Sequence, residues 1–177
     1  MTRSRVAIMA TVAFVATLAA AVSARAGSDR IAFPNDYAKG VIYKTEDRAE
    51  NKQVRELFIP REAVEAVRRG APLPSGTVIT SVRYAAQLDA EGNPVKNANG
   101  RFIKTDQILG YTVKEKRAGW GAEYPEETRN GEWEYRVFRA DKTANTKYDA
   151  CFGCHKSQQS QDYLFTYDSL KAASRAE

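Results

Sequence analysis

The chain has 177 residues, with 27 Lys and Arg against 22 Asp and Glu and a formal net charge of +5. Three of the arginines (Arg3, Arg5 and Arg25) lie in the first 26 residues, which contain no acid, so the rest carries 24 basic and 22 acidic side chains, a formal +2. This small excess, with no basic cluster beyond doublets such as Arg68-Arg69, argues against nucleic-acid binding, and the remaining length fits about one domain.

The first residues indicate export. Two arginines precede an apolar run over 6–22 that only Thr11 and Thr17 interrupt, and the run leads to Ala24-Arg25-Ala26. A basic start, an apolar stretch and a small-x-small site are typical of a secretory signal peptide. The alternative is an uncleaved membrane anchor, but the run is a little short for a span of ~20 residues. We therefore predict a signal peptide over 1–26, cleavage after Ala26 and a periplasmic location.

In the first half of the chain after residue 26, the sequence predicts one strand and two helices. Pro34-Asn35-Asp36-Tyr37 is typical of a turn or cap that begins a short helix. Residues 44–53 are charged and lack apolar periodicity, which predicts a loop, whereas 54–59 is strand-like. A helix is expected from Pro60 to near Gly70, since apolar residues recur there at helical spacing.

The second half predicts a sheet. Residues 77–88 are rich in β-branched and aromatic side chains, the turn clusters 89–94 and 97–100 follow, and 108–113 is a further strand. Residues 132–138 alternate between apolar and charged side chains, as in a half-buried antiparallel strand. A helix is expected within 162–173. The prediction is a single α+β domain, mainly an antiparallel β-sheet with a few short helices.

Cys151-Phe152-Gly153-Cys154-His155 matches the attachment pattern of a c-type haem. Cysteines three apart lie on one face of a helical turn and can meet the two vinyl groups, and the following histidine can ligate the iron. The same residues could form a redox dithiol, half of a zinc site or a short-loop disulfide. Zinc would need a second Cys or His pair, and a thioredoxin-like dithiol would need a βαβ surrounding. We predict one haem c, covalently attached near the C-terminus through Cys151 and Cys154, with His155 as the iron ligand.

The sixth coordination position has no common ligand. His155 is the only histidine, and the two methionines, Met1 and Met9, both fall in the predicted signal peptide. Electron-transfer cytochromes usually fill this position with Met or a second His. Lys, Tyr, the new α-amino group and water remain. We therefore predict five-coordinate iron that binds a small ligand, the alternative being an electron carrier with an unusual sixth ligand.

The chain resembles the cytochrome P-460 family, which includes the related cytochromes c′-beta, over residues 33–170. The resemblance implies a mainly antiparallel β fold, usually a homodimer, with five-coordinate haem facing a pocket lined by the sheet. It rests on the segments Phe33-Pro34-Asn35-Asp36-Tyr37, Pro74-Ser75-Gly76-Thr77-Val78-Ile79, Gly131-Glu132-Trp133-Glu134-Tyr135 up to Phe138, the Cys151–His155 motif, and Asp162-Tyr163-Leu164-Phe165-Thr166.

The resemblance implies two possible chemistries. P-460 cytochromes oxidise hydroxylamine with a lysine bonded to the haem macrocycle, whereas c′-beta members lack that bond and bind nitric oxide. Alignment on Gly76-Thr77-Val78 places Ser81 where the cross-linking lysine would be, with Lys96, Lys104 and Lys114 as conceivable substitutes. We expect a protein that binds a small nitrogen-oxide ligand, the alternatives being a hydroxylamine-oxidising enzyme or an electron carrier with a redox partner protein.

Further site residues follow from the resemblance. Arg55 falls where the family keeps a distal arginine and Glu115 near a distal acid. A guanidinium could donate hydrogen bonds to an iron-bound ligand and a carboxylate could accept protons from one. For each, the alternative is a solvated charge at a strand edge. A set of aromatic residues could line the pocket or simply pack in the core: Trp133, Tyr135, Phe138 and Phe165.

Overall fold

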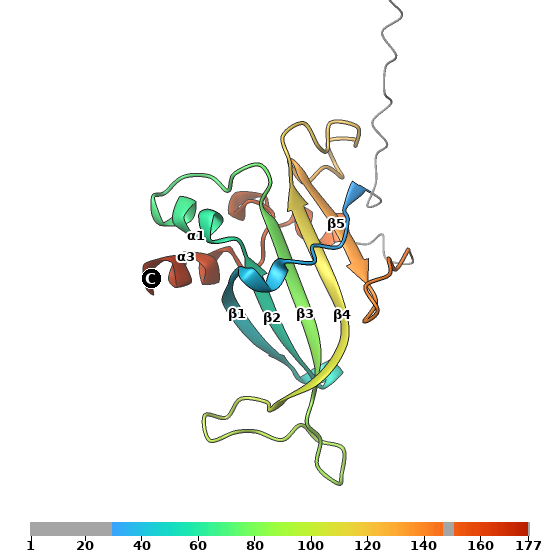
Figure 1. Cartoon of the computed structure of the whole chain (residues 1–177). Coiled ribbons are helices and arrows are strands. Elements are labelled where there is room, and N and C mark those ends of the chain that lie inside the picture. Colours follow the sequence, from blue (N-terminus) through green and yellow to red (C-terminus); the bar gives the residue numbers. More distant parts are fainter. Residues whose placement is uncertain (1–29, 147–150, 177) are drawn as a thin grey trace, which may run out of the picture.

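The computed structural model describes residues 30–146 and 151–176, which form a five-stranded antiparallel sheet with short helices (Figure 1). The strand order is β1-β2-β3-β4-β5, so every strand pairs with its neighbour in sequence. This confirms the predicted α+β, mainly antiparallel architecture, while the predicted signal peptide lies outside the described residues. The elements are η2 (Tyr37–Lys39), β1 (Val41–Arg48), η3 (Ala49–Asn51), β2 (Gln53–Ile59), α1 (Arg61–Arg68), β3 (Val78–Ala86), β4 (Lys104–Lys116), β5 (Trp133–Phe138), α2 (Cys151–Lys156), η4 (Gln159–Gln161) and α3 (Tyr167–Ala176).

One face of the sheet, here called the helix face, is covered by α1 and α3. Side chains of an antiparallel strand alternate between the two faces, and Leu57, Ile79 and Tyr135 share a buried cluster with Val64 of α1 and Leu170 of α3. Helix α1 is amphipathic, and its buried residues 63, 64, 66 and 67 form one stripe, as the sequence predicted. The helix face therefore carries one half of the hydrophobic core.

The other face, here called the N-terminal face, is covered by the segment around η2. Ile31 is buried there against Val82, Val113 and Phe138, and Phe33 lies edge-on to Tyr111 with ring centroids 4.8 Å apart. In Figure 1 this blue segment crosses the sheet on the side away from α1 and α3. The sheet is thus a central layer between the helices and the N-terminal strap.

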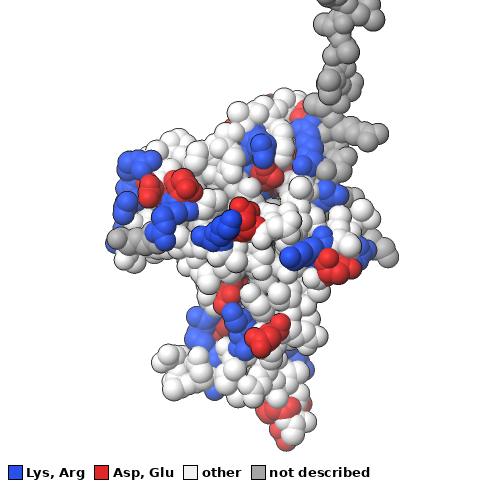
Figure 2. All heavy atoms as spheres, in the orientation of Figure 1, with Lys and Arg blue, Asp and Glu red and all other residues white. Residues whose placement is uncertain are grey.

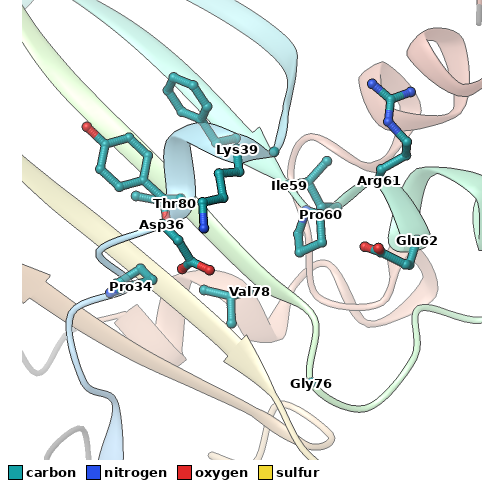
Figure 3. A pocket seen from close by; sticks show the side chains of 13 residues that line it. Pro34, Asp36, Lys39, Ile59, Pro60, Arg61, Glu62, Gly76, Val78 and Thr80 are labelled. Atoms are coloured by element: carbon teal, nitrogen blue, oxygen red, sulfur yellow. The ribbon is translucent and has the colours of Figure 1, made fainter.

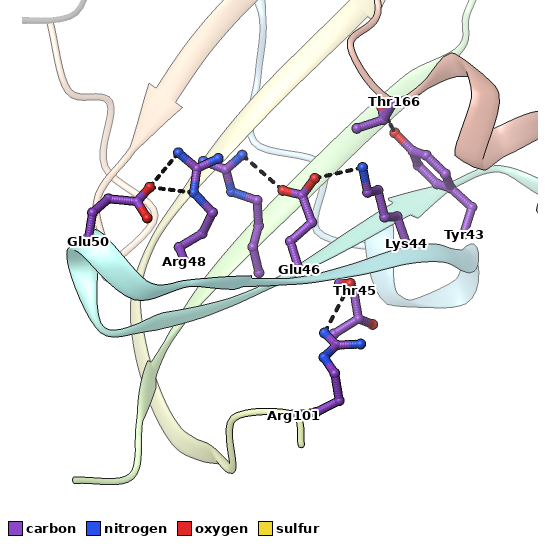
Figure 4. A network of polar contacts seen from close by, with 9 residues as sticks. Tyr43, Lys44, Thr45, Glu46, Arg48, Glu50, Arg101 and Thr166 are labelled. Atoms are coloured by element: carbon purple, nitrogen blue, oxygen red, sulfur yellow. Dashed lines mark hydrogen bonds and ion pairs between the residues drawn. The ribbon is translucent and has the colours of Figure 1, made fainter. Parts of the chain in front are cut away.

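The prediction of a loop over 44–53 is wrong for its first half, because β1 continues to Arg48. β1 pairs with β2 throughout, from Val41↔Ile59 to Arg48↔Gln53, with one irregularity after Ile42. It lies at the edge of the sheet, where a strand needs only one row of backbone partners and charged side chains are common. Its charges are also paired, for example Lys44 with Glu46 at 2.8 Å (Figure 4). The charged side chains that predicted a loop therefore belong to an edge strand.

Two other elements differ from their predicted bounds. β4 is longer than the predicted 108–113, and α3, from Tyr167 to Ala176, continues three residues past the predicted segment 162–173. Residues 87–103 form a hairpin that extends from the end of β3 and β4 (Figure 1). Arg101 anchors it, donating to both carboxylate oxygens of Asp47 at 2.7 and 3.0 Å. The hairpin is tied to β1 although it lies outside the core.

Basic and acidic side chains are interspersed on the surface seen in Figure 2. Within residues 30–146 and 151–176, no helix is long and apolar enough to span a bilayer.

Candidate functional site

Helix α2 presents the Cys-x-x-Cys-His residues in one short turn and a half. Cys151 and Cys154 are both thiols, the first half-buried and the second exposed, and they are three residues apart on the helix. Side chains at this spacing lie on the same helical face. Gly153, between them, has no heavy atom within 4 Å of where a Cβ would stand. Both thiols therefore lie on one face of the helix.

The His155 ring is oriented by a backbone carbonyl. Nδ1 lies 2.6 Å from the oxygen of Tyr163. A carbonyl can only accept a hydrogen bond, so Nδ1 carries the proton and the lone pair of the neutral ring is on Nε2. Burial, together with the nearby positive charge of Lys114, lowers the pKa of His155 to about 4, so the ring is neutral at pH 7. A neutral imidazole whose Nδ1–H donates to a carbonyl is the arrangement found in metal-ligating histidines.

Aromatic rings surround this imidazole. Tyr135 of β5 stacks on it with centroids 4.7 Å apart, and Phe165 meets it edge-on at 5.1 Å. Asn130 supports Tyr135, donating to its hydroxyl at 3.1 Å and to the carbonyl of Phe152 at 3.0 Å. Phe165 is 53% exposed. The position of His155 is thus fixed from the sheet, and an apolar surface beside it is open.

Asp162 fixes the segment that supplies the Tyr163 carbonyl. Its carboxylate accepts a hydrogen bond from Lys116 Nζ at 2.8 Å and one from the Trp133 indole at 3.2 Å. Asp162 and Tyr163 have φ of 51° and 58°, a region that residues other than glycine rarely occupy. The two side-chain contacts with the sheet hold this tight turn, so the His155 acceptor depends on β4 and β5.

Polar side chains also lie on the helix face near His155. Lys114 of β4 is directly opposite Tyr135 in register, and it is only 9% exposed. Burial, together with the nearby charge of Arg55, lowers the pKa of Lys114 to about 8. Ser81 lies on the same face, paired with Thr112 two residues before Lys114 on β4. The Ser81 hydroxyl and the Arg55 Nε are buried without a hydrogen-bond partner among the described residues.

The structure brings Arg55 to the helix face but places Glu115 on the other one. Glu115 follows Lys114 on β4, so its side chain alternates to the N-terminal face. There it pairs with Arg117 and lines a shallow pocket with Trp120. The site around His155 therefore contains Lys114 where the sequence pointed to Glu115.

The remaining predicted residues also divide between the faces. Phe138 packs in the cluster on the N-terminal face, away from His155. Lys96 lies in the hairpin, and Lys104 is paired with Glu56 at 2.6 Å. A cleft of about 390 Å³ opens on the N-terminal face beside η2, with Thr80 at its base (Figure 3). None of these features touches the residues around His155.

The chain matches the family model for cytochrome P460 over residues 34–166. This span covers most of the 177 residues, so the chain belongs to the cytochrome P460 family, which confirms the resemblance seen in the sequence. Membership indicates a c-type haem protein and implies a haem cofactor. No match was found among the curated proteins.

The described residues fit a haem. Two thiols and a neutral imidazole with its lone pair on Nε2 are presented by one short helix. Phe165 offers an exposed apolar surface beside the imidazole, and buried polar atoms on the adjacent sheet lack partners. A haem is an apolar macrocycle with two carboxylate groups, so its binding site needs both an apolar surface and polar hydrogen-bonding groups.

Sequence reasoning did not find the supporting roles of Asp162, Asn130 and the Tyr163 carbonyl. The Tyr163 acceptor is a backbone atom in an unusual conformation, for which the sequence holds no direct signal. The burial of Lys114 follows from the register of β4, which places Lys114 on the same face as Thr112 and Lys116, opposite the apolar side chains of β5.

Proposed function

We propose that this chain is an exported, single-haem c-type cytochrome that binds a small nitrogen-oxide ligand such as nitric oxide. Cys151 and Cys154 would form the two thioether bonds and His155 Nε2 would ligate the iron. When bound, the haem supplies an iron with one open coordination position. The observation that carries the proposal is the orientation of His155, whose Nδ1 proton is held by Tyr163 at 2.6 Å while Nε2 remains available.

The chain's own residues would hold and screen the ligand site. Tyr135 and Phe165 position the proximal imidazole between them. Arg55, whose Nε lacks a partner among the described residues, would donate a hydrogen bond to a polar ligand. No Met or second His follows residue 26, which favours an open sixth position.

The proposal is tested with purified protein after periplasmic expression. Intact mass should show one haem and an N-terminus at Gly27. Electron paramagnetic resonance of the ferric protein should show high-spin iron, and the ferrous protein should bind nitric oxide and carbon monoxide directly. The variant His155→Ala should lose the ferrous spectrum of the wild type. A mass without haem, or a low-spin ferric spectrum at neutral pH, would contradict the proposal, and the latter would favour an electron carrier.

Hydroxylamine oxidation is the second candidate, and the position of Lys114 is the observation that favours it. Of Lys96, Lys104 and Lys114, only Lys114 is buried on the helix face near His155. Its amine could take the role of the lysine that Ser81 replaces. We nevertheless expect an ordinary c-type haemochrome and weak or absent hydroxylamine turnover, since the aligned position holds a hydroxyl, a much poorer nucleophile than an amine.

Peptide mapping separates the two candidates. Wild-type protein and Lys114→Met are digested, and Lys104→Met serves as the control for a lysine outside the site. Under the main proposal, the haem peptide contains only the Cys151–Cys154 segment in all three proteins. A haem peptide tethered to a Lys114 peptide in the wild type and the control, and released in Lys114→Met, would establish the enzymatic alternative.

Assembly belongs to the same proposal. We expect a homodimer, because the family resemblance implies one, and a redox partner protein that keeps the iron reduced. Light scattering coupled to size-exclusion chromatography would measure the mass in solution; a monomer at all concentrations would exclude the dimer.

A further inference from the structure

Arg83 of β3 is a partly buried arginine without an anion. Within residues 30–146 and 151–176, its guanidinium makes no hydrogen bond and no ion pair, and its Nε is fully shielded from solvent. A guanidinium has five N–H donors and stays charged at any physiological pH. Buried donors of this kind are normally paired, because leaving them unpaired is costly. The buried Nε–H of Arg83 therefore lacks an acceptor.

The neighbours of Arg83 add to the local excess of positive charge. Arg83 is directly opposite Arg55 in the β2–β3 register, and like charges directly opposite each other destabilise a strand pair. Burial lowers the pKa of Arg55, and the charges of Arg48 and Arg83 lower it further against the pull of Glu46. A negative group between the two guanidinium groups would remove this repulsion.

The nearby carboxylates are already engaged. Figure 4 shows Glu50 bound to Arg48 and Glu46 bound to Lys44, and these contacts are 2.7 and 2.8 Å long. Glu46 also reaches Arg55, at a longer 3.4 Å. Four basic side chains, counting Arg83, thus share two acidic ones in this described part of the sheet. The surplus of positive charge matches a ligand with carboxylate groups.

Gly110 makes room for the Arg83 guanidinium. It is opposite Arg83 in the β3–β4 register, and a Cβ at this position would stand 2.5 Å from Arg83 Nη2. The guanidinium therefore occupies the space that a side chain at position 110 would fill.

The position of Arg83 relative to His155 suits a haem propionate. Tyr135, which stacks on His155, is opposite Lys114, and Arg83 is opposite Gly110, four residues back along the same strand. At ~3.3 Å per residue the separation along the sheet is about 13 Å. Ser81 and Thr112, two small residues, occupy the level between them. A flat ring attached at α2 could lie over these small residues with its polar edge towards Arg83.

We propose that Arg83, together with Arg55, forms a binding site for a carboxylate-like oxyanion on the helix face of the sheet. The oxyanion has two possible sources: a propionate of the attached haem, or a free anion such as nitrite that enters the ligand pocket. Both present two oxygens at the spacing of a guanidinium fork. This inference rests on the proposed function, because either source requires a haem at His155.

The experiment compares haem-loaded wild type with Arg83→Met, Arg83→Lys and the surface control Arg68→Met. Met keeps the length of the side chain and removes the charge, whereas Lys keeps the charge and loses the fork. Intact mass is measured first, so a failure to attach haem in the wild type counts against the proposed function alone. Three readouts follow on each loaded protein: the propionate bending bands in resonance Raman spectra, the midpoint potential, and the dissociation constant of nitrite for the ferric form.

If a propionate is the anion, Arg83→Met and Arg83→Lys both shift the bending bands. Arg83→Met also lowers the midpoint potential, because loss of a nearby cation favours ferric iron, and nitrite affinity stays the same. If a free anion is the ligand, nitrite binds at least tenfold more weakly to Arg83→Met while the bands stay unchanged. The proposal is overturned if Arg83→Met differs from the wild type in none of the three readouts by more than Arg68→Met does.

Discussion

Replacing Asp162 with Ala tests whether the turn after α2 controls the position of His155. The carboxylate holds Lys116 and the Trp133 indole. Because the Asp162 side chain is 25% exposed, losing the ammonium contact costs about 1 kcal/mol. Losing the indole contact costs about 1 kcal/mol, and keeping Ala in the left-handed region costs about 1 kcal/mol more. We expect Asp162→Ala to lower the free energy of unfolding by about 3 kcal/mol.

Asp162→Asn is the matched control. Asn tolerates the left-handed conformation and keeps an acceptor for the indole, so only the contact with Lys116 is lost, because the Asn amide nitrogen cannot accept from its ammonium. We expect a decrease of about 1 kcal/mol in urea unfolding followed by circular dichroism. In the ferrous, haem-loaded protein, the iron–histidine stretching band should shift in Asp162→Ala and remain nearly unchanged in Asp162→Asn. Equal losses in the two variants, or an unshifted band in Asp162→Ala, would refute this account of the turn.

Three further changes test the sheet and its attachments. Leu170→Ala removes a fully buried side chain between α3 and the helix face, and urea unfolding should show a loss of about 2–5 kcal/mol; a loss below that range would mean that α3 contributes little to the core. Gly110→Ala places a Cβ 2.8 Å from the Phe138 carbonyl oxygen and 2.5 Å from Arg83 Nη2, at φ +144°; the melting temperature should fall well below that of Gly100→Ala, where no atom lies within 4 Å of the new Cβ. The hydrogen bond from Arg101 holds the pKa of Asp47 below its usual value of 3.8; its stabilising effect is therefore present above that value and lost as pH falls below it. Amide exchange of residues 87–103, corrected for the intrinsic rate, should rise in that acidic range for the wild type. Asp47→Asn should show the raised exchange already at neutral pH. Protection that does not depend on pH in the wild type would contradict the role given to the Arg101–Asp47 pair.

The regular elements were predictable where side-chain periodicity and burial agree. α1 shows its apolar stripe because one side of the helix packs on the sheet. β5 is a strand as expected, but it is buried on both faces and not half-buried, with Glu134 fully buried. β1 was not predictable in this way. It is an edge strand whose side chains pair with one another, so its stability comes from the ladder to β2 and its charges carry no burial signal.

The site was predictable only in part. The spacing of Cys151, Cys154 and His155 is a local pattern, and the helical turn expected for it is present. The choice between Lys114 and Glu115 depends on the register of β4, and a shift of one residue exchanges the two faces of a strand. Motif alignment does not fix register at that level, whereas the pairing of Lys114 with Tyr135 does. The missing acceptor of Arg83 depends on contacts between strands, so it cannot be predicted from any single segment of the sequence.

The pairing of every strand with its neighbour in sequence has a consequence for the order of assembly. All four ladders of the sheet are complete by Phe138, before any residue of α2 is required. Pairings between adjacent segments are also those that chains form most rapidly. The C-terminal segment then arrives last, bringing Leu164 and Leu170 to close the helix face. During synthesis, the two cysteines are therefore still outside the core when the face of the sheet that they approach already exists, so they remain accessible until the C-terminal segment closes over that face.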